Sequence, residues 1–389
     1  MNRICVSFIT SYDVNCGIAR YSAELISELR KFIDIIVVPF GPQVWQRLCL
    51  PSDIRTQRKH AIEAATVASF ADLVHIQFQP QLFGGLHPMK CTLPILLKRL
   101  SKPAILTVHE LDIYGNLATA TLKLLINAWL LRHKTVKHII AHNRFTARWL
   151  TRLGVEPRKI SIIPMWAQKP SLPKELSQRG AVTVEAIAEA KLQARKMLGL
   201  NCKHAIGIFG FIVKRRGHHL LLKALEPFPD ETLLIIIGGK HPLDTTDYYE
   251  ALMEWINKWR FRDRVIITGF VSDEILPLWL CALDFVVAPF THLTESASLL
   301  RCISYGLPIV CSDLEPLREL HGRANCTRLF SAGDIVSLRN TILELLEDEE
   351  LRIRLANNAL TYALSYNVEH ATTLTLQAYE KALQIEPIK

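Results

Sequence analysis

The sequence lacks the short motifs that most often identify an enzyme. It contains no GxGxxG dinucleotide fingerprint, no Walker GxxxxGK(S/T) loop, no HExxH zinc motif and no GxSxG nucleophile motif. It has no apolar run near the ~20 residues of a membrane-spanning helix, and no CxxC pair. These absences exclude the best-known dinucleotide, ATP, zinc-protease and serine-hydrolase sites.

Cysteine usage and the first residues indicate the compartment. The nine cysteines are scattered, and Cys281, Cys302 and Cys311 lie in apolar stretches. This pattern indicates buried thiols in a reducing compartment rather than disulfides or a zinc site. The opening MNRICVSFITSYD has no small-residue cleavage site and is typical of a first strand, not of a signal peptide. We therefore expect a cytoplasmic protein.

The chain is basic, with 46 lysines and arginines against 37 aspartates and glutamates. Such an excess suits nucleic acid, an anionic membrane face or a phosphate-bearing substrate. The cations are spread along the chain without a helix-turn-helix, RNP-like or zinc-finger pattern, so we expect no nucleic-acid partner.

Apolar strand patterns alternate with helical patterns along most of the chain. Short runs such as Ile33–Pro39 and Ala104–Val108 alternate with amphipathic segments such as Ile18–Lys31. The alternation breaks between Trp166 and about Leu200 and then restarts. This order predicts an α/β protein with two Rossmann-like, doubly wound domains facing a central cleft, where the carboxyl ends of the strands bind ligands.

The domain boundaries follow from the same break. We assign 1–167 to an N-terminal Rossmann-like domain and 168–203 to a linker and helix. Residues 204–365 form a second Rossmann-like domain, and 366–389 a C-terminal helix that crosses back to the first.

Two stretches of the first domain suit a ligand site. Cys16-Gly17 lies between the first strand and helix, where glycine lets backbone approach a ligand, although a plain turn glycine is the alternative. His109 directly follows the strand Ala104–Val108, beside Glu110. Its side chain can donate a hydrogen bond or shuttle a proton there, or simply cap nearby backbone.

Two stretches of the second domain suit an anion. Gly210 opens a loop that carries Lys214, Arg215 and Arg216, which could neutralise a diphosphate or form a solvated loop. The stretch 295–314 opens with Glu295 and the small residues 296–298 before a short helix. That helix start can bind an anion, or belong to an ordinary loop-helix-strand unit.

A membrane contact is suggested by Leu122–Lys137, LKLLINAWLLRHKTVK, in which an apolar-aromatic stripe is edged by cations. This pattern is typical of an interfacial helix. A core-facing helix with a basic C-terminal end is the alternative. The stretch therefore leaves a peripheral position on the inner membrane face open.

Several of these stretches resemble one family. CGIARYSAEL, LTVHELD and GIFGFIVKRRGHHLLLKAL are similar to retaining nucleotide-sugar glycosyltransferases of family four, which have the GT-B fold. ITGFVSDEILPLWLCALDFVVAPF and ESASLLRCISYGLPIVCSDLEPL resemble its most distinctive region. The likeness covers nearly the full chain and is strongest over 205–320.

The resemblance implies transfer of a hexose from a nucleotide-diphosphate sugar to a saccharide, polysaccharide or lipid-linked acceptor, with retention and without a metal or other cofactor. The C-terminal domain would hold the donor and the N-terminal domain the acceptor. Amides and cations would stabilise the leaving diphosphate. The implied residues are catalytic His109 and Glu295; donor-binding Gly17, Gly210, Lys214, Arg215, Arg216, Ser296, Ser298 and Leu299; and acceptor-side Cys16 and Glu110.

The chain departs from the family pattern at two places. The glutamate pair that the family usually carries falls on Leu293 and Arg301, and Glu295 is out of register. The usual arginine after the phosphate-loop glycine is Phe211, and the expected lysine is Arg216, which keeps the charge and changes its shape. The alternative function is therefore a weak or inactive glycosyltransferase-like binding or assembly protein.

Overall fold

The computed structural model describes residues 3–14, 16–51, 53–87, 89–111, 117–173, 176, 182–227, 229–241, 246–385 and 388. The chain divides into two compact units. Unit 1 comprises Met1–Met165 and Val368–Lys389, and unit 2 comprises Trp166–Asn367. The segment expected as a linker, 168–203, belongs to unit 2, and its residues 174, 175 and 177–181 lie outside the described part.

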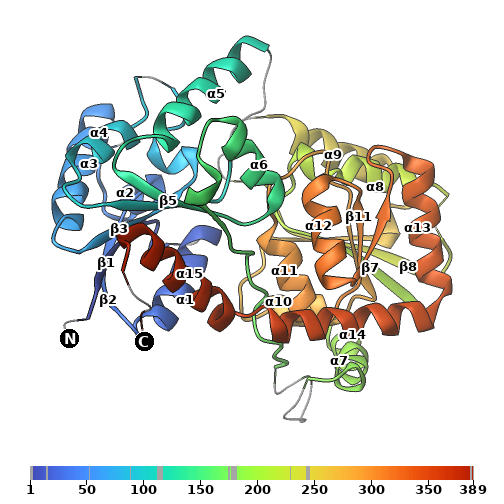
Figure 1. Ribbon diagram of the computed structural model, residues 1–389. Helices are drawn as coiled ribbons and strands as arrows, with labels where there is room; N and C mark the ends of the chain where they lie inside the picture. Colours follow the sequence, from blue (N-terminus) through green and yellow to red (C-terminus); the bar gives the residue numbers. More distant parts are fainter. Residues whose placement is uncertain are drawn as a thin grey trace. The chain divides into compact units, whose positions relative to one another are not determined.

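Unit 1 is built on a six-stranded parallel sheet of order β2-β1-β3-β4-β5-β6 (Figure 1). Its strands are β1 (Cys5–Thr10), β2 (Asp34–Pro39), β3 (Leu73–Phe78), β4 (Ala104–Val108), β5 (Val136–Ala141) and β6 (Ile160–Ile162). Its helices are α1 (Gly17–Leu29), α2 (Pro42–Arg47), α3 (Ile54–Ala68), η1 (Pro80–Phe83), α4 (Leu93–Arg99), α5 (Leu117–Leu131), α6 (Arg144–Arg152), η2 (Pro157–Lys159) and α15 (Val368–Leu383).

Unit 2 repeats this plan with the parallel order β12-β11-β10-β7-β8-β9. Its strands are β7 (His204–Phe209), β8 (Thr232–Ile237), β9 (Val265–Gly269), β10 (Phe285–Ala288), β11 (Ile309–Ser312) and β12 (Thr327–Phe330). Its helices are α7 (Val184–Met197), η3 (Lys214–Arg216), α8 (His218–Ala224), α9 (Tyr248–Lys258), η4 (Arg262–Arg264), α10 (Leu276–Cys281), α11 (Ala297–Ser304), α12 (Glu315–Ala324), α13 (Ile335–Glu347) and α14 (Glu349–Ser365).

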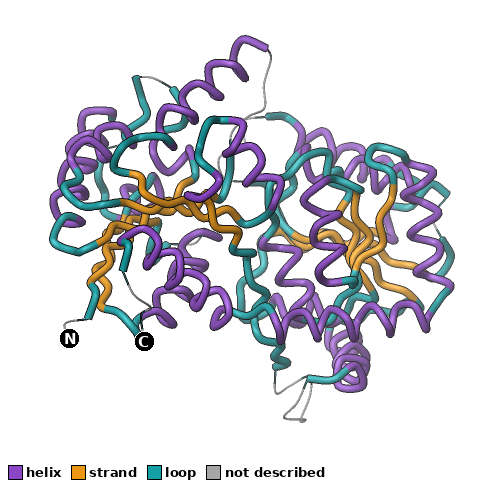
Figure 2. Tube along the Cα trace, in the orientation of Figure 1, coloured by secondary structure: helices purple, strands orange, loops and turns teal. Residues whose placement is uncertain are grey.

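The strands of each unit lie between helices (Figure 2). This position explains the sequence pattern, because a parallel strand covered on both faces reads as a continuous apolar run rather than an alternating one. All residues of β3, β4 and β10 are buried. The predicted α/β class with two parallel, doubly wound sheets is confirmed.

The last helix, α15, packs on α1, β4 and β5 of unit 1. Tyr379 of α15 is fully buried, and its hydroxyl lies 2.7 Å from Nδ1 of His75 in β3. This contact anchors the helix to the middle of the sheet.

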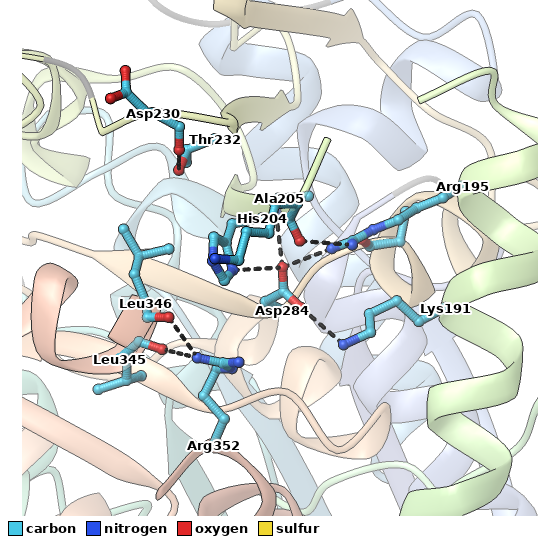
Figure 3. Close-up of polar contacts among 12 residues, drawn as sticks. Lys191, Arg195, His204, Ala205, Asp230, Thr232, Asp284, Leu345, Leu346 and Arg352 are labelled. Atoms are coloured by element: carbon cyan, nitrogen blue, oxygen red, sulfur yellow. Dashed lines mark hydrogen bonds and ion pairs between the residues drawn. The ribbon is translucent and has the colours of Figure 1, made fainter. Parts of the chain in front are cut away.

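A buried ion cluster ties α7 to the amino-terminal edge of the sheet in unit 2 (Figure 3). The Asp284 carboxylate accepts hydrogen bonds from Lys191 Nζ at 2.8 Å, Arg195 Nη2 at 2.6 Å and the Ala205 amide at 2.8 Å. Burial acts to raise the pKa of Asp284, but the two cations and these hydrogen bonds outweigh it and leave the pKa below its ordinary value. The cluster precedes β7 and β10, so it lies at the sheet edge opposite their carboxyl ends.

The expected interfacial helix Leu122–Lys137 is not a single helix. Helix α5 ends at Leu131, and Lys137 lies in β5. The chain turns at His133, whose carbonyl accepts from the Val136 amide at 2.9 Å. Val136 then pairs with β4, because burying a β-branched residue in the sheet outweighs extending the helix.

Candidate functional site

The loop after β7 is held by two glycines that the fold requires. Gly210 has φ +116° and Gly217 has φ +74°, both in the region that side chains disfavour. A Cβ on Gly217 would lie 1.9 Å from the Pro289 carbonyl oxygen, and one on Gly210 would lie 2.6 Å from the Arg216 guanidinium. The backbone conformation of this loop therefore requires glycine at both positions.

Within this loop, the three consecutive cations are divided between solvent and interior. Lys214 and Arg215 are exposed, whereas Arg216 is half-buried. Arg216 Nη1 donates to the Phe209 carbonyl at 2.8 Å and to Ser298 Oγ at 3.1 Å. The guanidinium carbon also lies 5.2 Å from the centre of the Phe290 ring.

The Arg216 guanidinium is held in place by these contacts, carries a positive charge and has one N–H group that the contacts do not use. Burial, and secondarily Arg215, lower the pKa of Arg216 to about 10, so it remains charged at neutral pH. Its Nε is enclosed and has no hydrogen-bond partner among the described residues. An enclosed charge with an unused N–H is costly alone and is stabilised by an anion.

The start of α11 lies beside this cation. Ser296 is the N-cap residue, with extended backbone at φ −143°, and its Oγ lies 3.0 Å from Ser298 Oγ. Glu295 Oε1 accepts from the Ser296 amide at 3.1 Å, and the Leu299 amide donates to the Ser296 carbonyl at 3.1 Å. Arg216, Ser298 and the first turn of α11 thus form one positively polarised corner.

The residues at the departures from the family pattern are used in packing. Arg301 Nη1 donates to Asp273 Oδ1 at 2.7 Å, and its side chain is 13% exposed. Leu293 is buried. The Phe211 ring packs edge-on against His241, with ring centres 4.7 Å apart. Among the described residues, no group of three or more His, Cys, Asp or Glu side chains could hold a metal ion.

In unit 1, Gly17 is a glycine that the fold does not require. It is the first residue of α1, its φ is not positive, and among the described residues no atom lies within 4 Å of a Cβ built there. Cys16, the N-cap residue, accepts from the Ala19 amide at 3.3 Å and lies 3.1 Å from Ser11 Oγ. The helix start is therefore capped, and the space beside Gly17 is open.

His109 is held by hydrogen bonds at the carboxyl end of β4. Its Nε2 lies 2.7 Å from Gln77 Oε1 and its Nδ1 lies 3.3 Å from His142 Nε2. The Tyr21 ring packs edge-on against it, with ring centres 4.8 Å apart. Burial, followed by the neighbouring His142 and His75, holds the pKa of His109 well below its ordinary value, so the ring is neutral at pH 7. Glu110 accepts from Gln79 Nε2 at 3.2 Å.

Gln77 and His142 are contacts that the sequence analysis missed. His142 follows Ala141 of β5 as His109 follows Val108 of β4, and these two preceding residues are paired in register. The signal was available, because equivalent positions after neighbouring parallel strands meet at one sheet edge. A further histidine, His75, lies inside β3 and is fully buried.

Two family models match the chain, one in each unit. "Glycosyltransferase Family 4" matches residues 16–166, and "Glycosyl transferases group 1" matches residues 203–348. Together they leave out only the segment around α7 and the two ends of the chain.

Characterised relatives and solved structures agree with these matches. The chain is 22% identical to the 2-deoxystreptamine glucosyltransferase of Streptomyces kanamyceticus, covering 88% of this chain and 83% of the relative. It is 25% identical to the Campylobacter jejuni N,N'-diacetylbacillosaminyl-diphospho-undecaprenol alpha-1,3-N-acetylgalactosaminyltransferase, covering 65% and 63%.

The fold is similar to that of Anabaena HepE, solved in complex with UDP and glucose. The TM-score is 0.74 at 18% identity, over 98% of this chain and 100% of that one. With matched models over both units and this fold, the chain belongs to family four of the GT-B glycosyltransferases.

Proposed function

We propose that the protein transfers a hexose from a nucleotide-diphosphate sugar to a saccharide, polysaccharide or lipid-linked acceptor, with retention and without a metal. The observation that carries the proposal is the half-buried Arg216 guanidinium, whose Nε has no hydrogen-bond partner among the described residues, beside Ser298 and the start of α11. A diphosphate supplies the acceptor oxygens that this corner lacks, and it gains negative charge as the sugar leaves.

On this proposal, unit 2 binds the donor. Arg216, the hydroxyls of Ser296 and Ser298 and amides in the first turn of α11 hold the phosphates, with Gly210 leaving room for the guanidinium. The exposed Lys214 and Arg215 attract the nucleotide without fixing it, because solvent screens them. HepE binds UDP, which makes UDP sugars the first donors to test.

On the same proposal, unit 1 binds the acceptor. Gly17 leaves open space for the donor phosphates, and His109 contacts the transferred sugar. Cys16 and Glu110 line the acceptor side, and Glu295 contributes from the α11 loop. We propose front-face transfer, in which the leaving phosphate takes the acceptor proton, because the sequence offers no clear carboxylate nucleophile near the reacting carbon.

The test is nucleotide binding and turnover with EDTA present. UDP, GDP and ADP and their sugars are compared by thermal shift, since a ligand that binds only the folded state raises Tm. Arg216→Met should abolish the shift, and the matched control Lys214→Met should keep most of it. NMR of the product anomer tests retention. Binding without turnover, across a broad acceptor panel, would favour the inactive binding protein instead.

We further propose that unit 1 contacts an anionic membrane face. Residues 90–165 carry 13 lysines and arginines but only 3 acidic residues, a net charge of +10, whereas the whole chain has +9. The positive excess therefore lies entirely in this part of unit 1, not evenly along the chain. Each cation near an anionic bilayer contributes about 1 kcal/mol.

Helix α5 adds an apolar face to this charge. Leu122, Leu125 and Trp129, spaced by three and four residues, are 47%, 64% and 51% exposed on one side of the helix. At the end of the helix, Lys134 and Lys98 both lower the pKa of His133, after burial. No helix in the described part of the chain is long and apolar enough to cross a bilayer.

Vesicle sedimentation tests the contact. Wild type should pellet with phosphatidylglycerol vesicles and not with phosphatidylcholine vesicles, and high salt should release it. Trp129→Ser should weaken pelleting severalfold, while Phe70→Ser, which removes an 80% exposed aromatic outside α5, should not. Equal pelleting of these two variants would rule out α5 as the contact.

A further inference from the structure

A continuous line of side-chain hydrogen bonds crosses the core of unit 1. It begins at the Tyr379 hydroxyl of α15, 2.7 Å from His75 Nδ1. His75 Nε2 lies 2.7 Å from Thr107 Oγ1 and 3.2 Å from Gln77 Nε2. The line continues through Gln77 Oε1 to His109 Nε2 at 2.7 Å.

The line ends at a backbone carbonyl beyond β5. His109 Nδ1 lies 3.3 Å from His142 Nε2, and His142 Nδ1 lies 2.9 Å from the Ile163 oxygen. Both ring nitrogens of His109 are therefore engaged inside unit 1. The protons on this line can be counted, because a carbonyl oxygen only accepts.

The count gives one proton too many for two neutral rings. The Ile163 oxygen requires a proton on His142 Nδ1, and the Gln77 Oε1 position requires one on His109 Nε2. The contact between His109 Nδ1 and His142 Nε2 then requires a third proton. The arrangement with Gln77 Oε1 toward His109 therefore holds one imidazolium.

Reversing the Gln77 amide removes the extra proton. The amide nitrogen then donates to the lone pair of His109 Nε2, and His109 Nδ1–H donates to His142 Nε2. On the other side, Gln77 Oε1 accepts from His75 Nε2–H, and His75 Nδ1 accepts from the Tyr379 hydroxyl. Every contact keeps a donor and an acceptor, with the His75 Nε2–H shared between Gln77 Oε1 and Thr107 Oγ1. The oxygen and nitrogen of an amide are assigned from such networks rather than seen.

Burial decides between the two arrangements, because an imidazolium enclosed in the core is costly, and burial holds the pKa of His109 well below its ordinary value. Among the described residues, His142 after β5 and His75 of β3 both lower the pKa of His109. The Tyr21 ring of α1 packs edge-on against His109, and burial raises the pKa of Tyr21, so its hydroxyl stays protonated. Tyr379 of α15 lies beyond His75, and the nearest carboxylate in sequence, Glu110, bonds to Gln79.

We propose that Gln77 and His142 are positioning residues that hold His109 as a neutral ring, with its proton on Nδ1 and the Gln77 amide nitrogen facing Nε2. His109 then holds its orientation and carries no proton between substrates. The tautomer can be measured in the resting protein, whereas its importance for sugar transfer rests on the function proposed above.

The first experiment is NMR of the full chain labelled with ¹⁵N-histidine, without nucleotide, at pH 7.5. His109 and His142, assigned by substitution, should each show a protonated Nδ1 and an unprotonated Nε2. An imidazolium or an Nε2–H tautomer at His109 in wild type would overturn the proposal. Transferase activity does not enter this readout, so a failure of the proposed function is a separate result.

Two variants separate positioning from simple packing. In Gln77→Glu the carboxylate can only accept, so it should stabilise a cation and raise the apparent pKa of the His109–His142 pair by about one to three. Gln77→Met, of similar size, should not. Identical titrations of the two variants would contradict the proposal. If neither folds, the wild-type tautomer decides.

A third comparison tests His142 on turnover. His142→Gln can still accept from His109 and donate to the Ile163 oxygen, whereas His142→Phe can do neither. The glutamine variant should retain the Nδ1–H tautomer of His109 and most of kcat. In the phenylalanine variant the Nδ1–H tautomer should be lost and kcat should fall at least tenfold. Loss of the tautomer in His142→Gln alone would refute the proposed contact.

Discussion

Gly17→Ala separates ligand binding from folding more cleanly than any other single change in this chain. The new methyl enters open space, because among the described residues no atom lies within 4 Å of that Cβ position. Gly17 starts α1, and alanine is the better helix former by at most about 1 kcal/mol. For a unit of this size, Tm should rise by no more than about 4 °C.

The effect on transfer should have the opposite sign. If the donor phosphates lie against Gly17, the methyl displaces them by about 1 Å, and such a displacement costs about a hundredfold in rate. We therefore expect kcat/KM to fall about a hundredfold, which corresponds to about 2.7 kcal/mol of transition-state stabilisation.

The assay pairs a thermal melt with a nucleotide-release assay on the same preparation. Gly217→Ala is the matched control, because its Cβ would meet the Pro289 carbonyl at 1.9 Å in a backbone of φ +74°. That variant should lose stability as well as activity. Full activity in a stable Gly17→Ala would refute the role given to this glycine, and a large fall in its Tm would refute the claim of open space.

Three further changes have definite expected results. Arg216→Lys keeps a charge but loses the fork, so titration calorimetry should show nucleotide binding about tenfold weaker, with Arg216→Met weaker still. Asp284→Asn should cost up to about 3 kcal/mol in urea unfolding at pH 7, because two partly buried cations lose their buried counter-charge. Because the pKa of Asp284 is lowered in the folded state, its contribution to stability is present above about pH 4 and is lost as the pH falls through the pKa of the folded state. A urea midpoint of the wild type that stays unchanged down to pH 2 would contradict this. Arg301→Glu places the family's usual residue beside Asp273 and should lower Tm without raising activity, and Asp273→Arg in the same chain should restore Tm.

The layered fold could be predicted from the sequence because a strand buried on both faces appears as a continuous run of apolar residues. Ala104–Val108, predicted from its apolar run, is β4 without a change of bounds. The helix expected over Leu122–Lys137 was wrong at its end. Apolar residues on a helix and in a buried strand look alike when only a short turn separates them.

The sequence predicted which residue types form the site but not which way each side chain points. The sequence places three cations side by side, and only the glycine-bounded turn shows that Arg216 points inward while Lys214 and Arg215 do not. Likewise His109 was visible as a strand-end histidine. Its partner His142 follows β5 in the same way and could have been found from the sequence. Gln77 lies inside β3 and comes within reach only through the register of β3 with β4.

The contact between Tyr379 and His75 joins residues separated by 304 positions, with all of unit 2 encoded between them. At the usual 5–20 residues per second of synthesis, about 15–60 s pass between the two. During that interval the ribosome finishes unit 2, while the α15 face of the older sheet stays uncovered. The unit begun first is thus completed last, because its sheet waits for the final helix of the chain.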